Sequence, residues 1–156
     1  MANAPFGSGQ YVTIADLSPG DIIWANVFVH IDDLVNRNSN SSTALAVRGN
    51  RSHGRYCIVL QKGDTFVDVA YFTTFNYQTA FPAALARRLN FWYPVQPAWQ
   101  ESFPYHPLPA LSGFAQWVSL RRKHRIIGNN GWFQKFPVSA PPTATTLYWA
   151  MLDTPH

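Results

Sequence analysis

Two β-rich runs joined by a short turn constrain the fold of this chain most strongly. The first run, Tyr56–Gln61, is apolar and follows the basic cluster His53-Gly54-Arg55. A turn at Lys62-Gly63-Asp64 leads into a second run that ends in Thr73-Thr74. Antiparallel pairing about such a turn brings the outer ends of the two strands back together. The sequence therefore predicts a hairpin over residues 53–76, with Arg55 and Thr73 meeting at a sheet edge where a cation and a hydroxyl suit a phosphate.

Further strands are predicted on both sides of this hairpin. The Pro19-Gly20 pair fits the centre of a type II turn and precedes a β-branched and aromatic run over residues 21–29. Residues 116–127 are typical of two short strands separated by a basic stretch, and residues 132–138 of another strand after the turn at 128–131. Short helices are predicted within residues 79–90 and 143–153, the second with a strand as the alternative.

Three segments interrupt this pattern within a single domain of 156 residues. Residues 1–10 are expected to form a frayed tail. Residues 32–52 are polar and rich in Asn, Ser and Arg, which predicts a long loop, either a flap over the Arg55 cluster or an insertion without function. Residues 91–112 alternate prolines with aromatic residues, which predicts an irregular excursion that packs against the sheet or, alternatively, stacks bases or sugars.

Composition limits the classes of protein to which the chain can belong. Apolar residues make up 47% and charged residues only 13%, so the chain has material for a core and a thinly charged surface. Cys57 is the only cysteine and is expected to be a buried small hydrophobe. We find neither a signal peptide nor an apolar run near the ~20 residues of a membrane helix. The sequence therefore predicts a cytoplasmic protein that has no membrane partner.

Basic residues dominate the second half of the chain. The formal net charge is +4, and Glu101 and Asp153 are the only acids after Pro82. Such a distribution suits a polyanionic partner such as RNA, DNA or anionic lipid, and equally well an ordinary solvated face. The predicted RNA contacts are Arg121, Arg122, Lys123 and Arg51.

The side chains available for catalysis are cationic and hydroxylic. The five histidines are scattered without metal-ligand spacing, and a single glutamate disfavours a two-carboxylate glycosidase, so no metal or cofactor is predicted. Cleavage of RNA by its own 2′-hydroxyl needs a base, a proton for the leaving oxygen and positive charge beside the phosphorane. Arg55, Thr73 and His53 have the chemistry for these roles, although an exposed, uninvolved histidine is the alternative for His53.

Three short motifs in order resemble those of MazF/PemK-type toxins. They are Pro19-Gly20-Asp21-Ile22-Ile23-Trp24, the stretch from Gly54 to Gln61, and Val69-Ala70-Tyr71-Phe72-Thr73, with residues 114–127 as a looser fourth match. The resemblance implies a small SH3-like barrel, a homodimer and metal-independent cleavage of single-stranded RNA. It also implies that Arg55 is the catalytic arginine and Thr73, or the adjacent Thr74, the catalytic hydroxyl.

The sequence thus predicts a mostly β fold: a small SH3-like barrel with one or two short helices and a long Pro/aromatic insertion. Two functions follow from it. One is a metal-independent endoribonuclease or ribotoxin-like protein; the other is a non-catalytic SH3-like module that binds nucleic acid, protein or glycan. Whether an antitoxin-like partner exists stays open.

Overall fold

The structure, a computed structural model, describes residues 8–73, 81–83, 85, 91–98, 108, 115–127 and 132–139. These residues are mostly β, as the sequence predicts. None of the helices among them is long and apolar enough to cross a membrane. The predicted helices at 79–90 and 143–153 and the turn at 128–131 lie wholly or largely outside the described residues.

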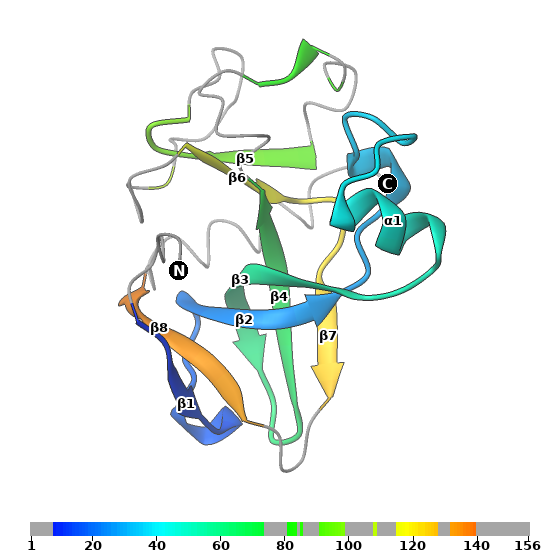
Figure 1. The fold of residues 1–156 in the computed structure, drawn as a ribbon. Helices are drawn as coiled ribbons and strands as arrows, with labels where there is room; N and C mark the ends of the chain where they lie inside the picture. Colours follow the sequence, from blue (N-terminus) through cyan, green and yellow to red (C-terminus); the bar gives the residue numbers. More distant parts are fainter. Residues whose placement is uncertain are drawn as a thin grey trace.

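Eight strands, two 3-10 helices and one α-helix make up the described fold (Figure 1). Their order is β1 (Gln10–Val12), η1 (Ile14–Asp16), β2 (Asp21–Val27), η2 (Ile31–Asp33), α1 (Ser42–Arg48), β3 (His53–Lys62), β4 (Phe66–Thr73), β5 (Trp92–Val95), β6 (Gln116–Ser119), β7 (His124–Ile127) and β8 (Phe133–Ser139).

The strands form one antiparallel sheet that does not close into a barrel among the described residues. Its order is β1-β8-β2-β3-β4-β6-β5, and β7 also pairs with β4. β3 runs along one side of β4, while the other side is shared: Phe66–Val69 pair with β7, and Phe72 and Thr73 pair with β6. The sheet therefore branches at β4. β6, followed by β5, extends it beside the end of β4 that carries Thr73, and β7 extends it beside the other end (Figure 1).

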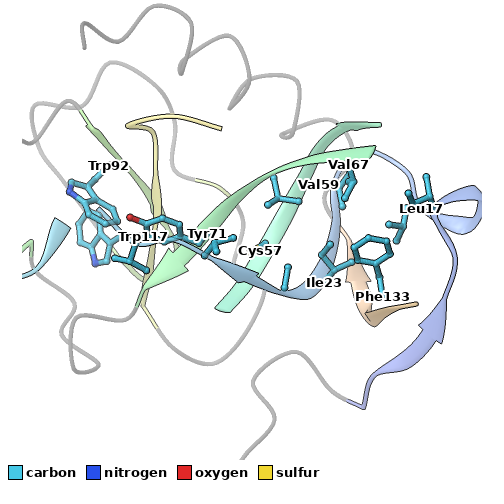
Figure 2. Close-up of a cluster of buried hydrophobic side chains, with 14 of the residues drawn as sticks. Leu17, Ile23, Cys57, Val59, Val67, Tyr71, Trp92, Trp117 and Phe133 are labelled. Atoms are coloured by element: carbon cyan, nitrogen blue, oxygen red, sulfur yellow. The ribbon is translucent and has the colours of Figure 1, made fainter. Parts of the chain in front are cut away.

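The central strands are buried on both faces. Side chains alternate between the faces of a strand, so Ile23, Cys57 and Val59 enter one hydrophobic cluster while Ile22 and Ile58 enter another. Burial on both faces explains why β3 and β4 have continuous apolar runs rather than a polar–apolar alternation. In the first cluster, Tyr71, Trp92 and Trp117 lie toward one end and Leu17 and Phe133 toward the other (Figure 2).

The turn before β2 has the geometry that its Pro-Gly pair predicts. Gly20 has φ of 96°, the left-handed region that favours glycine, and Asp21 N donates to Ser18 O at 3.0 Å across the turn. The Asp21 carboxylate also accepts from Ser18 N at 2.8 Å. This turn fixes where β2 begins, and the predicted strand at 21–29 is confirmed over 21–27.

Several sequence predictions need correction. The segment 32–52 is not a continuous loop, because Asp33 ends η2 and residues 42–48 form α1, whose N-cap Ser41 accepts from Ala44 N at 3.2 Å.

The excursion at 91–112 is not irregular throughout, because it includes a regular strand, β5. This strand lies at the edge of the sheet and therefore tolerates Pro94. The tail predicted at 1–10 is ordered at its end, where Gln10 pairs with Lys135; residues 1–7 lie outside the described part. The predicted strands at 116–127 and 132–138 are confirmed as β6, β7 and β8.

Gly54 is required for a close contact between β2 and β3. A Cβ added at Gly54 would lie 2.5 Å from the Trp24 ring, which also packs edge-on against Tyr56 at 4.9 Å between centroids. We expect Gly54→Ala to lower the free energy of unfolding by about 1–3 kcal/mol, as overpacked substitutions do. Urea denaturation measures the loss. In a Trp24→Ala background the same change should cost much less, and an equal cost in both backgrounds would contradict the contact.

Candidate functional site

The hairpin of β3 and β4 brings Arg55 and Thr73 to one cavity. β3 and β4 pair with Cys57 opposite Tyr71, and continuing that register by two residues sets Arg55 opposite Thr73. Both residues line a cavity of about 430 Å³. Its remaining lining comes from the segment between β2 and β3, from Tyr71 and from β5: Val29, Asp33, Leu34, Val35, Asn36, Ser39, Ser41, Thr43, Tyr71 and Trp92.

Arg55 is largely buried and only partly satisfied by the protein. Its Nη2 donates to Thr43 Oγ1 at 2.8 Å, and its Nη1 reaches Phe72 O at 3.5 Å. Nε is buried without a hydrogen-bond acceptor among the described residues. A guanidinium has five N–H donors, so donor capacity remains unused at this cavity. Burial lowers the pKa of Arg55, against the opposing effects of Tyr71, Cys57 and Asp33.

The nearest carboxylate on the cavity wall, Asp33, is engaged by other groups. Arg121 Nε donates to Asp33 Oδ1 at 2.9 Å, and both Ser119 Oγ and the Tyr71 hydroxyl donate to Oδ2. The Asp33 side chain is 1% exposed and that of Arg121 12% exposed. Burial and the Asp33 carboxylate raise the pKa of Tyr71, so the phenol stays protonated as a donor. Asp33 therefore compensates Arg121, and no ion pair joins Arg55 to a carboxylate in the described part of the chain.

The wall opposite the sheet is held by hydrogen bonds within residues 30–48. Asp33 belongs to η2, which begins at the N-cap His30, whose Nδ1 accepts from Asp32 N at 3.0 Å. Asp32 pairs with Arg37, and Arg48 of α1 donates to Arg37 O and Ser39 O at 2.6 and 2.7 Å. Because α1 is fixed in this way, Thr43 on its first turn faces Arg55. The segment predicted as a flap is thus a structured wall of the cavity.

His53 lies beside this cavity rather than in its lining. It is two residues before Arg55 on β3, so both side chains project from the same face of the strand. Partial burial and then the positive charge of Arg55 lower the pKa of His53. The imidazole is therefore neutral near pH 7 and is able to accept a proton.

His124 is a second titratable group behind the site. Its ring centroid lies 5.3 Å from that of Tyr71, and burial, followed by the charge of Arg122, lowers its pKa to about 4. A histidine in an unfolded chain has a pKa of about 6.5. The folded state thus resists protonation of this side chain until the pH is well below that of ordinary histidine titration.

This difference predicts acid-sensitive stability that depends on His124. Because its pKa is lower in the folded state, the stabilising contribution is complete above about pH 6.5 and is lost as pH falls toward 4; the loss amounts to about 3 kcal/mol. Urea denaturation at pH 7.5, 5.5 and 4.5 measures it. His124→Gln should show a shallower decline than wild type over that window, whereas parallel declines would contradict the assignment.

The basic residues predicted to contact RNA have different surroundings. Arg121 is paired with buried Asp33, and Lys123 lies 3.6 Å from the buried carboxylate of Asp68. Arg122 is exposed, and so is Arg51, whose Nη2 reaches Leu45 O at 3.4 Å. Two of the four are therefore engaged by buried acids, and two face solvent.

A second buried acid, Asp68, links β4 to β7. Asp68 receives two hydrogen bonds from Arg125, at 2.9 and 3.0 Å, and one from Gln61 at 2.6 Å. Burial alone would raise the pKa of this carboxyl, but the hydrogen bonds from Arg125 and Gln61, together with the charges of Arg125 and Lys123, lower the pKa. The Arg125 guanidinium also lies 3.8 Å from the centroid of the Phe66 ring. The charge of Arg125 thus stabilises the pairing of β7 with β4.

Sequence reasoning missed Asp33, Tyr71, Ser119 and Thr43, which complete the surroundings of Arg55 and Arg121. For Asp33 a signal was available, because an Asp pair flanked by Ile31 and Leu34 places acids in an apolar setting that demands partners. The distant partners Ser119 and Arg121 come together with Asp33 only through the pairing of β6 with β4.

Among the described residues, no group of three or more His, Cys, Asp or Glu side chains is arranged to hold a metal ion. Neither protein-family models, nor curated proteins, nor solved structures give a match to this chain.

Proposed function

We propose that the protein is a metal-independent endoribonuclease that acts on single-stranded RNA, with the scissile phosphate at Arg55. The observation that carries this proposal is a largely buried arginine without an ion-pair partner, facing a cavity whose polar lining is mostly hydroxyl groups and whose one carboxylate, Asp33, is paired with Arg121. Buried charges in proteins are normally paired, so an unpaired guanidinium calls for an anion from outside. A phosphodiester oxygen supplies one, since phosphate and guanidinium form charge-assisted hydrogen bonds.

The chemistry follows from three side chains. The 2′-hydroxyl attacks the adjacent phosphorus, a cyclic phosphate forms, the bond to the 5′-oxygen breaks and the leaving 5′-oxygen takes up a proton from water. Arg55 stabilises the negative charge of the phosphorane, and Thr73 donates to a phosphate oxygen. His53, neutral because of its lowered pKa, accepts the proton of the 2′-hydroxyl.

The resemblance to MazF/PemK-type toxins supports the choice of RNA. Arg55 and Thr73 stand at the positions where that family has its catalytic arginine and hydroxyl. The SH3-like barrel of that family belongs to the proposal as well, on the support of the β2, β3 and β4 pairing and of β8 beside β2. The homodimer belongs to it on the resemblance alone. The exposed side chains of Arg122 and Arg51 would contact the RNA backbone on either side of the scissile phosphate.

A non-catalytic RNA-binding module is the second candidate. It is favoured by the position of His53 outside the cavity lining and by Tyr71, whose raised pKa and bond to Asp33 keep it from acting as a base. In this case Arg55 would bind a phosphate without cleavage.

Incubation with end-labelled single-stranded RNA in EDTA separates the two candidates. The nuclease produces shorter fragments ending in a 2′,3′-cyclic phosphate, and Thr73→Val slows their formation. The binding module gives salt-dependent affinity, with a log–log slope of about −0.7 per phosphate contact, and intact RNA. No binding and no cleavage at low salt would reject both.

A further inference from the structure

A groove outside the Arg55 cavity has the chemistry of a ring-binding site. It has a volume of about 320 Å³ and is lined by residues of β1, β2, β7 and β8 and by Trp132 just before β8. Small-ligand pockets begin at about this size. None of the side chains that line it is charged. A ligand here is therefore neutral where it contacts the protein.

Three aromatic side chains line the groove and remain open to solvent. Tyr11 and Trp132 are each 67% exposed and Trp24 is 42% exposed. The sheet register sets Tyr11 of β1 and Trp24 of β2 on either side of Gln134 in β8. Large aromatics gathered in one groove at such exposure mark a binding surface, whereas scattered apolar side chains do not.

Two amide side chains accompany these rings. Asn26 and Gln134 line the groove, and neither makes a hydrogen bond to protein in the part of the chain that the structure describes. Each amide offers both donors and an acceptor. Aromatic faces beside free amides are suited to a planar ring with a polar edge, and protein sites for unpaired nucleobases combine stacking with hydrogen bonds to such edges.

The groove and the proposed phosphate site are built on the same pair of strands. Ala25, which lines the groove, pairs with Arg55 in the β2–β3 ladder, whereas Trp24 and Asn26 project from the opposite face of β2. Each nucleotide of an RNA strand carries both a base and a phosphate, so one strand offers a group to each site, which a neutral glycan does not. We propose that this groove binds an unpaired nucleobase of the RNA strand whose phosphate is bound at Arg55. The choice of RNA rests on the proposed function, but cleavage is not required for it.

Tyr11 and Trp132 are the side chains to change, because Trp24 also packs over Gly54 and against Tyr56. Phe28, 51% exposed and outside the groove, provides a matched aromatic control. Affinities are measured by fluorescence anisotropy in EDTA for a labelled oligouridylate and for an abasic ribose-phosphate oligomer of the same length. Sedimentation gives the oligomeric state of each variant.

Trp132→Ala and Tyr11→Ala should each weaken oligouridylate binding about tenfold, the scale of losing one stacked base. The same variants should bind the abasic oligomer as wild type does, and Phe28→Ala should bind both oligomers normally. Arg55→Ala should weaken both. The inference is overturned if the groove variants bind oligouridylate normally, if they lose both oligomers equally, or if they only dissociate a dimer. Base-dependent binding without cleavage would support nucleobase binding in the groove and reject the nuclease. Cleavage of RNA by groove variants that bind oligouridylate normally would support the nuclease and reject nucleobase binding in the groove.

Discussion

Arg55→Ala is expected to reduce RNA cleavage by at least about 100-fold, since removal of one donor to a developing oxyanion costs 10²–10³ in rate. The guanidinium is the only described cation that lines the cavity, so no neighbouring group there replaces its charge. Arg55→Lys should retain part of the activity, because an ammonium keeps the charge but loses the planar fork of donors. Initial rates in EDTA measure the effect.

Arg51→Ala provides the matched control for this variant. Arg51 is exposed and four residues away along the chain, so its loss should change the rate only severalfold, and this difference should shrink as the ionic strength rises. Thermal unfolding of each variant establishes that the protein remains folded. Cleavage by a folded Arg55→Ala variant at the wild-type rate would remove Arg55 from the mechanism.

Asp33→Ala is expected to destabilise the protein by about 3–5 kcal/mol, the scale of removing one partner from a buried ion pair. The change leaves Arg121 buried without its carboxylate and deprives Ser119 and the Tyr71 hydroxyl of their acceptor. Arg121 Nη2 already lacks a hydrogen-bond partner among the described residues, so the cluster has little capacity to compensate. Urea denaturation at pH 7 measures the loss.

The adjacent Asp32 is the control for Asp33. Its side chain is 25% exposed and pairs with the exposed Arg37, so Asp32→Ala should cost no more than about 1 kcal/mol. In an Arg121→Met background the cost of Asp33→Ala should fall, because no buried charge is left unpaired. Equal costs for Asp33→Ala and Asp32→Ala would show that the buried cluster contributes little.

Local signals in the sequence were sufficient for most of the strands. The hairpin of β3 and β4 follows from two β-rich runs around a glycine-containing turn, and Gly20 gives the turn before β2 through its positive φ. Both signals act over a few residues, which is why they are visible without a structure. The same register argument brings Arg55 and Thr73 to one cavity.

The remaining features depend on contacts between distant residues. α1 was obscured by the Asn- and Ser-rich run before it, although Ser41 and the following STALAVR have an N-cap and helix formers. The ion pair of Asp33 with Arg121 joins residues 88 apart in the chain, and Thr43 meets Arg55 only because α1 folds onto the sheet. Charge counting cannot distinguish Arg121, whose charge is neutralised inside, from Arg122, which faces solvent.

The most direct test of the central claim is the NMR resonance of the Arg55 Nε–Hε group during titration with single-stranded RNA in EDTA. The signal is assigned by its absence from the spectrum of Arg55→Lys. We predict that it shifts progressively and saturates with the bound fraction, because a phosphate oxygen then accepts from this guanidinium. An Arg55 signal that stays unchanged while the RNA is fully bound would contradict the account.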